Sequence, residues 1–147
     1  MGAPVVHWEI NSKDAKRLWD FYSQLFGWNI NSANPMNYGL VNTGSKSGIN
    51  GGIAQAGPGM AGTSVTFYVE VDDPQAYLNR IESMGGRTVV PVTEIPQMVT
   101  FALFVDPEGN TIGLVKSMPQ PKKAARPKKR VKRASRAKGR GARGRRK

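Results

Sequence analysis

The sequence predicts an α+β protein made of two tandem strand–helix–three-strand modules, which form a curved mixed sheet around a hollow, followed by a disordered basic tail. The first module opens with an alternating strand at residues 5–10 and continues as a helix. The same order of elements returns 59 residues later, which aligns His7 with Thr66 and indicates an internal duplication. The predicted boundaries are modules 4–56 and 63–117 within one domain, 1–118, and a tail, 119–147.

The first strand and helix set the pattern of the module. A two-residue period puts Val6, Trp8 and Ile10 on one strand face, which is apolar and should pack under the helix. The other face carries Val5, His7 and Glu9. From Lys13 the spacing becomes helical, with Asn11 or Ser12 as the expected N-cap and Gly27 as the C-terminal stop. The predicted apolar stripe of this helix is Ala15, Leu18, Trp19, Tyr22, Leu25 and Phe26.

Turn and strand signals place the remaining elements. In the second module Asp73 is the expected N-cap, Pro74 takes the first helical position and Gly85–Gly86 end the helix. Its predicted stripe is Tyr77, Leu78, Ile81 and Met84. The sequence DPEGN at 106–110 predicts a tight hairpin turn. The other predicted strands are 28–31, 38–42, 49–55, 66–71, 87–92, 99–105 and 111–115, with a linker at 57–62 between the modules.

Charge is distributed very unevenly along the chain. Residues 1–115 contain six Lys or Arg and all ten acidic residues, a net charge of −4, whereas residues 122–147 contain fifteen Lys or Arg and no acid. The absence of cysteine excludes disulfides, thiolate metal sites and a cysteine nucleophile. No apolar stretch approaches the ~20 residues that cross a bilayer, so we expect a cytoplasmic protein without a membrane partner.

Several motifs together resemble the vicinal-oxygen-chelate superfamily, the group of glyoxalases, bleomycin-resistance proteins and extradiol dioxygenases. These motifs are His7 in a strand before a helix, FYSQLFGW at 21–28, the duplicated module and DPEGN before a final strand. The resemblance covers residues 4–117 and implies the fold. The resemblance says less about function than about fold, because proteins of one fold carry out many different chemistries. Members of the superfamily commonly pair, so we also expect a homodimer.

The resemblance also implies where a divalent metal would bind. His7 stands at the first ligand position, but the other three fall near Gly51 or Gly52, at Thr66 and at Gly113. Because a divalent ion needs several N or O donors, we expect no metal and no other cofactor. Metal-dependent lyase or dioxygenase activity is not expected, and whether the protein is an enzyme stays open.

We expect an unknown small molecule to bind in the hollow. His7 is either a hydrogen-bonded histidine or a ligand contact, and Glu9 is either a solvated or paired carboxylate or part of a concave binding site. Trp19, Tyr22 and Trp28 fit the core better than a stacking platform, and Tyr68 is the better candidate for an aromatic side chain in the hollow. The predicted ligand-binding residues are His7, Glu9, Thr66, Tyr68 and Gly113.

The tail has the composition of a segment that binds polyanions. It contains one sizeable apolar residue, Val131, and too little apolar surface to fold alone. We expect it to bind DNA or RNA through phosphate contacts, with nucleoid association if the partner is DNA; a solvated tail, or one folded back on the acidic domain, is the alternative. The predicted nucleic-acid-binding residues are Lys122, Lys123, Arg126, Lys128, Lys129, Arg130, Lys132, Arg133, Arg136, Lys138, Arg140, Arg143, Arg145, Arg146 and Lys147.

Two functional hypotheses from different classes follow. In the first, the domain binds a small molecule, or is a metal-independent enzyme, and the tail tethers it to nucleic acid. In the second, the protein is chiefly nucleic-acid-associated and the domain serves for dimerisation or interaction. A ligand in the hollow that depends on His7 would favour the first hypothesis.

Overall fold

A computed structural model describes residues 1–58 and 63–117, and this part of the chain contains eight strands and two helices. The predicted tail, 119–147, and residues 59–62 of the predicted linker lie outside the described residues. The elements in chain order are β1 (Val5–Ser12), α1 (Ala15–Phe26), β2 (Asn29–Asn31), β3 (Gly39–Asn42), β4 (Gly51–Gln55), β5 (Ser64–Val71), α2 (Pro74–Ser83), β6 (Arg87–Ile95), β7 (Val99–Val105) and β8 (Thr111–Lys116).

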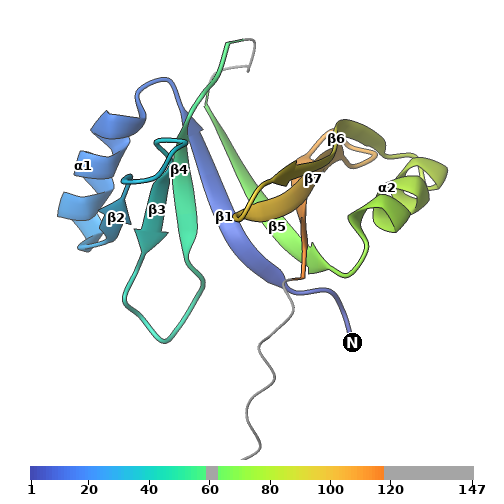
Figure 1. Cartoon of the computed structure of the whole chain (residues 1–147), viewed down its shortest axis with the longest axis horizontal. Coiled ribbons are helices and arrows are strands. Elements are labelled where there is room, and N and C mark those ends of the chain that lie inside the picture. Colours follow the sequence, from blue (N-terminus) through green and yellow to red (C-terminus); the bar gives the residue numbers. More distant parts are fainter. Residues whose placement is uncertain (59–62, 118–147) are drawn as a thin grey trace, which may run out of the picture.

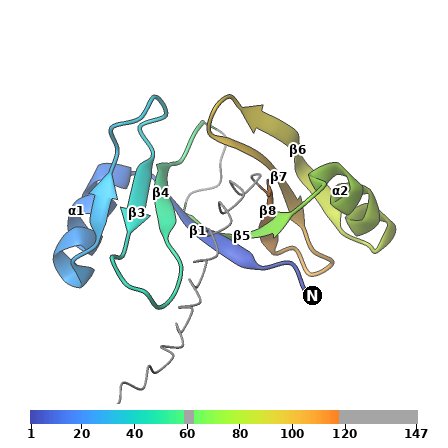
Figure 2. The same ribbon diagram turned by 60° about the horizontal axis from the view of Figure 1, so that its bottom comes forward.

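All the described strands belong to one mixed sheet. Their order is β2-β3-β4-β1-β5-β8-β7-β6, with β1 and β5 antiparallel to each other at the centre. The pairs β1–β4 and β5–β8 are parallel, which gives the two halves the same arrangement around the central pair. The sheet bends about this pair, with α1 and α2 on its outer side at opposite ends (Figures 1 and 2). The predicted α+β class is confirmed, and we call the side of the sheet opposite the helices the concave face.

The core of the first half lies between α1 and the sheet. Its buried residues are Ala15, Val41 and Ile53. Trp8 and Ile10 pack against them, as the strand alternation predicts, and Val6 is half-buried. The helix residues Leu18, Trp19 and Tyr22 also belong to this core. Leu25 and Phe26, predicted as part of the same stripe, are 56% exposed each, although the Phe26 ring still lies 4.9 Å from the Trp28 ring at the edge of this core.

The second half has an equivalent core beneath α2. Val71, Leu78, Ala102 and Leu114 are buried together, and Tyr77 and Ile81 pack against them. Met84, predicted as part of the same stripe, is instead 67% exposed because it is the C-cap residue rather than a residue of the helix body.

The helix ends were predicted with one error. Asp14, rather than Asn11 or Ser12, caps α1, and its carboxylate accepts from the Arg17 amide at 3.0 Å. The reason is that β1 continues through Ser12, whose hydroxyl accepts from the Asp14 amide instead. The predictions for Asp73, for Pro74 at the first turn of α2 and for Gly27, which is left-handed at φ 66°, are confirmed.

Most strand positions agree with the prediction, and β7 agrees to the residue. The largest difference is β6, which runs to Ile95 rather than ending at 92. The DPEGN turn is confirmed, with the Asp106 amide donating to the Asn110 carbonyl at 3.0 Å. A register shift between Val5 and His7 breaks the predicted alternation at the start of β1, so that Val5 lies opposite Val69. Neither described helix is long or apolar enough to cross a membrane.

Candidate functional site

The central strand pair brings together four of the five residues predicted to bind a ligand. Because Trp8 and Ile10 pack beneath α1, the alternation of β1 turns His7 and Glu9 to the concave face. In the antiparallel pairing, His7 lies opposite Tyr68 and Glu9 lies opposite Thr66. Side chains of directly opposed residues share a face, so the four form one group at the middle of the sheet.

Glu9 is the centre of a hydrogen-bond network at this position. Its Oε1 accepts from Asn11 Nδ2 at 3.1 Å and from the Tyr68 hydroxyl at 3.2 Å. Its Oε2 accepts from the Tyr38 hydroxyl at 3.0 Å. The half-buried Glu9 carboxylate therefore accepts three hydrogen bonds from neighbouring side chains. We call these residues with His7 the tyrosine–glutamate cluster (His7, Glu9, Asn11, Tyr38 and Tyr68).

Tyr38 was missed by the sequence analysis, which placed it in a predicted strand without a role. It precedes β3, and Asn34 holds its backbone by accepting from the Tyr38 amide at 3.0 Å and donating to its carbonyl at 2.7 Å. This clamp directs the Tyr38 side chain across the sheet to Glu9. The available signal was Gly52, because a glycine in a strand interior often marks the close approach of another group.

His7 closes the network on its other side. Its Nε2 lies 2.9 Å from the Tyr38 hydroxyl, and its ring meets the Tyr68 ring edge-on at a centroid distance of 5.8 Å. Burial lowers the pKa of His7, although the nearby Glu9 carboxylate acts in the opposite direction. The neutral imidazole is therefore favoured, and it can exchange hydrogen bonds with a ligand.

Both tyrosines of the cluster are held in the neutral form. Burial raises the pKa of Tyr38 and of Tyr68 well above the ordinary range, and the charge and hydrogen bonds of Glu9 add to this effect. The two neutral hydroxyls donate to the Glu9 carboxylate. Neither is suited to serve as a phenolate base.

Two glycines make room for these tyrosine rings. A Cβ on Gly52 would lie 1.9 Å from the Tyr38 hydroxyl oxygen, and a Cβ on Gly113 would lie 2.1 Å from Tyr68 Cδ1. Gly52 of β4 pairs with Glu9 of β1, and Gly113 of β8 pairs with Tyr68 of β5. The two glycines therefore occupy equivalent places in the two halves of the sheet. The register thus assigns the second family ligand position to Gly52. Gly51 lies instead beneath the Trp8 ring.

The residues at the family metal positions do not fit a divalent ion. Two of the four positions are glycines covered by tyrosine rings, and the third is Thr66, which is 6% exposed. Within residues 1–58 and 63–117, no group of three or more His, Asp or Glu side chains is arranged to hold a metal. A single imidazole beside one carboxylate that is already hydrogen-bonded three times is a poor donor set.

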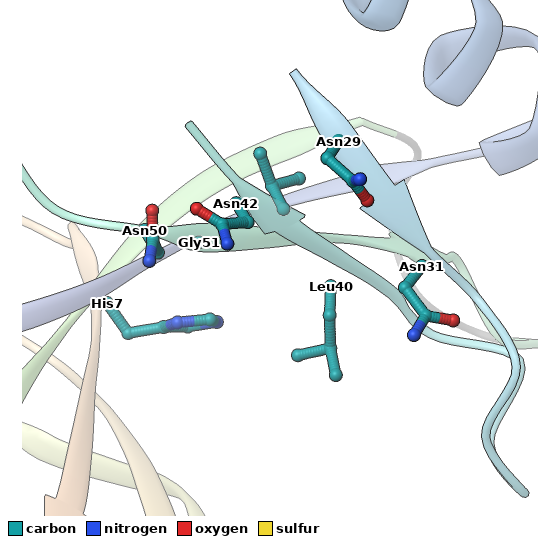
Figure 3. Close-up of a pocket in the computed structure, with 8 residues that line it drawn as sticks. His7, Asn29, Asn31, Leu40, Asn42, Asn50 and Gly51 are labelled. Carbon is teal, nitrogen blue, oxygen red and sulfur yellow. The ribbon is translucent and has the colours of Figure 1, made fainter. Parts of the chain in front are cut away.

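A cavity of about 400 Å³ opens beside the cluster. His7 is the residue that belongs to both, and Figure 3 shows its ring extending towards Leu40 and the asparagines of the neighbouring strands. Thr66, Tyr68 and Gly113 are buried, and the Tyr68 ring covers Gly113, so a ligand reaches Gly113 only if that ring moves. We call this cavity the asparagine pocket; it is lined by His7, Asn29, Asn31, Leu40, Val41, Asn42, Asn50 and Gly51.

The predicted nucleic-acid contacts, from Lys122 to Lys147, lie outside the described residues. The described part of the chain contains seven Lys or Arg, including Lys116, and ten acidic residues, which gives a net charge of −3. A domain with this charge does not attract a polyanion by itself.

The fold defines a glyoxalase-like domain. Of the four positions that the resemblance assigns to metal ligands, His7 occupies one, and Gly52, Thr66 and Gly113 occupy the other three. The family model for the glyoxalase-like domain matches residues 7–115, and the chain belongs to this family. A glyoxylase-like domain-containing protein of Didymella fabae is 28% identical in an alignment 112 residues long that covers 70% of this chain and 85% of that protein. The anthracycline biosynthesis protein DnrV of Streptomyces peucetius is 28% identical in an alignment 123 residues long that covers 74% of this chain but only 44% of DnrV.

Solved structures agree on the fold. Methylmalonyl-CoA epimerase from Mycobacterium tuberculosis superposes with a TM-score of 0.59 at 17% identity, covering 78% of this chain and 88% of the epimerase. A hypothetical protein of Bacillus halodurans superposes with a TM-score of 0.64 at 8% identity, covering 83% and 99% of the two chains. At these identities the likeness concerns architecture, and the predicted superfamily is confirmed.

Proposed function

We propose that this protein binds a small molecule on its concave face without the metal ion of the family. The observation that carries the proposal is the position of His7, which is hydrogen-bonded to the tyrosine–glutamate cluster and also lines the asparagine pocket. A concave site with a few convergent polar groups beside a titratable side chain is typical of a ligand site. Of the predicted ligand-binding residues, His7 lines the pocket; Glu9 and Tyr68 adjoin it through the cluster, and the buried Thr66 and Gly113 lie behind them.

The cluster supplies positioning rather than Lewis-acid chemistry. Tyr38 and Tyr68 hold the Glu9 carboxylate, and Tyr38 holds the His7 ring. A site of locked side chains binds with a smaller loss of conformational freedom than a flexible one. Ligand binding therefore depends on His7 both as a contact and as the end of this network.

The test begins with native mass spectrometry of the full-length protein, and any compound that copurifies with it is released with organic solvent and identified. Calorimetry then measures its affinity for the wild type, for His7→Ala and for the control Gln75→Ala, which changes an exposed position on α2. We expect a loss of at least about tenfold in the His7 variant, because one hydrogen bond and its contact area are removed. Unchanged affinity would remove His7 from the site.

We further propose that the tail, 119–147, binds DNA or RNA with little sequence preference. The support is its composition, fifteen Lys or Arg and no acid between 122 and 147, beside a domain of net negative charge. A chain ended at Ser117 should lose the affinity for duplex DNA. If it binds as tightly as the full chain, the tail is not the nucleic-acid element.

A second candidate function follows from the same composition. The domain would then serve a nucleic-acid-associated protein as a dimerisation or interaction module, with no ligand of its own. The support is apolar surface on the helix side of the central strands, where Val65 and Phe67 are 75% and 42% exposed. A chimaera that keeps the tail but carries an unrelated dimeric domain distinguishes the two candidate functions. If the chimaera retains every function of the full-length protein, including nucleic-acid binding, the second function is favoured.

We also propose that the two halves arose by tandem duplication and that the protein is a homodimer. The repeated order of elements and the matched positions of Gly52 and Gly113 support the duplication. The open sheet ends at β2 and β6, which are edges that pairing can cover. Light scattering at tens of micromolar tests the dimer, and a monomer mass would contradict it. A cytoplasmic or nucleoid location stays a prediction.

A further inference from the structure

The asparagine pocket has a wall of amide side chains. Asn29 and Asn31 come from β2 and Asn42 from β3, where Asn42 is paired with Asn29, and Asn50 immediately precedes β4. Apart from His7, none of the residues that line the pocket can carry a charge. Recognition in this pocket therefore rests on the orientation of the amides, since an amide presents a carbonyl acceptor on one side and two N–H donors on the other.

Hydrogen bonds to the backbone decide that orientation for three of them. Asn31 Oδ1 accepts from the Ala33 amide at 2.9 Å, and Asn42 Oδ1 accepts from the Gly44 amide at 2.8 Å. Asn50 Oδ1 accepts from the Thr43 amide at 3.1 Å. A backbone N–H can only donate, so the side-chain atom that faces each one must be oxygen.

The three Nδ2 groups are consequently available to a ligand. Within the described part of the chain, none of the three donates to a protein acceptor, whereas Asn11 and Asn34 in the same half of the sheet both do. The Nδ2 groups of Asn31, Asn42 and Asn50 border one hollow with the His7 ring and Leu40 (Figure 3). Asn31, Asn42 and Asn50 thus contribute neutral donors to the wall, whereas no hydrogen bond in the described part of the chain fixes which way the Asn29 amide points.

The His7 ring completes the pocket with one acceptor. The Tyr38 hydroxyl lies 3.0 Å from the Glu9 carboxylate, which only accepts, so its proton points there. The Tyr38 oxygen must then accept from His7 Nε2–H at 2.9 Å. This leaves Nδ1 of the neutral ring as the lone-pair nitrogen, so that donors outnumber acceptors in the pocket.

We propose that the asparagine pocket recognises ligand oxygens that only accept hydrogen bonds, those of a carboxylate or a carbonyl group, through Nδ2 of Asn31, Asn42 and Asn50. The inference rests on the proposed function, since it assigns the chemistry of the ligand at that same site. The three Nδ2 groups are donors, so they favour such oxygens over ammonium or guanidinium groups, which carry only donors and cannot accept a hydrogen bond from them. Leu40 offers the adjoining apolar surface for the carbon skeleton.

Three probes of similar size test the chemistry on the full-length protein. Malonate carries carboxylates, dimethyl malonate carries neutral carbonyl groups and methylguanidinium carries donors only. Each is titrated to ~10 mM, which detects millimolar dissociation constants. The side-chain NH₂ resonances of the asparagines are followed in ¹⁵N–¹H spectra, which separates the pocket from any binding of anions by the basic tail. We expect malonate or dimethyl malonate to shift the signals of Asn42 and Asn50, and methylguanidinium not to do so.

Asn42→Asp is the matched variant. It keeps an oxygen for the Gly44 amide, so the loop after β3 stays held. The substitution replaces the N–H donors by a second acceptor oxygen and adds a negative charge, so the neutral dimethyl malonate is the probe that reports the loss of the donors. Binding of the acceptor probe should weaken by about tenfold or more. Asn50→Asp makes the same change at a second site and guards against a folding defect in one variant. Asn79→Asp is the control, because Asn79 Oδ1 accepts from Gln75 on α2, on the other half of the sheet; its binding should equal the wild type.

The outcomes separate this inference from the proposed function. Shifts by an acceptor probe that are lost in Asn42→Asp and kept in Asn79→Asp support the inference, and malonate against dimethyl malonate tells carboxylate from carbonyl. A preference for methylguanidinium, no response to any probe, or equal binding by the Asn42 variant overturns it. Even when the probes overturn the inference, the proposed function stands if a copurified compound binds the wild type more tightly than His7→Ala. The proposed function fails if that compound binds both proteins equally.

Discussion

Gly113→Ala is the sharpest test of how the site is packed. The added Cβ would lie 2.1 Å from Tyr68 Cδ1 and 2.3 Å from Cε1, far inside any real contact distance. The backbone of Gly113 is outside the left-handed region, so alanine itself is not strained there. The whole effect of the substitution should therefore come from displacement of the Tyr68 ring.

The size of the effect follows from what that ring contributes. Forcing an extra methyl group into a packed site costs about 1–3 kcal/mol. If the ring moves, its hydroxyl leaves the Glu9 carboxylate, to which it donates at 3.2 Å; a hydrogen bond to a charged group is worth about 1.5–3 kcal/mol. Because the ring either stays under strain or moves and loses its hydrogen bond, the two costs are alternatives, and we expect a loss of roughly 1–3 kcal/mol in the free energy of unfolding.

Urea unfolding followed by circular dichroism measures this loss. With a slope of about 1–3 kcal/mol per molar urea, the midpoint should fall by roughly 1 M. The same substitution is then made in a Tyr68→Ala background, where the ring is absent. There Gly113→Ala should be neutral or stabilising by up to ~1 kcal/mol, since alanine restricts the unfolded chain more than glycine does.

Comparing Gly113→Ala in the wild-type and Tyr68→Ala backgrounds tests whether contact with the ring causes the loss of stability. If Gly113→Ala destabilises the protein equally with and without the Tyr68 ring, the contact between them is not the cause and the packing argument fails. Gly2→Ala, where nothing lies within 4 Å of the new Cβ, is the control for glycine-to-alanine exchange. It should change the midpoint very little.

Three further predictions concern the charge of the molecule. Glu9→Gln puts an NH₂ group where a tyrosine hydroxyl now donates, so the free energy of unfolding at pH 7 should fall by about 1.5–3 kcal/mol; a change below ~0.5 kcal/mol would contradict the network. Because burial lowers the pKa of His7 from 6.5, its contribution to stability is complete above that pH and is lost as the pH falls through the lowered pKa. Unfolding midpoints between pH 7 and 5 should therefore fall less in His7→Gln than in the wild type, and parallel curves would refute this. If about five tail cations contact phosphates, binding of the full chain to duplex DNA should weaken by roughly 500-fold between 50 and 200 mM salt in a fluorescence titration, and a weak dependence on salt would count against the tail.

Local sequence patterns determined much of this fold. The alternation from Val6 to Ile10 sets which face of β1 is polar, because successive strand residues point to opposite sides whatever the rest of the chain does. Asp73–Pro74, Gly27 and the DPEGN turn mark boundaries through backbone preferences that act within a few residues. The family resemblance and the place of His7 and Glu9 on one face could accordingly be read from the sequence.

Long-range register decided the site itself. Tyr38 reaches Glu9 across 29 positions of sequence only because β3, β4 and β1 are neighbours in the sheet. The choice between Gly51 and Gly52 depends on the pairing of β4 with β1, since a shift of one residue reverses the face. The free Nδ2 groups of Asn42 and Asn50 likewise follow from the loop amides that their oxygens meet. No local pattern contains these contacts, because residues far apart in the sequence form them only when the sheet assembles.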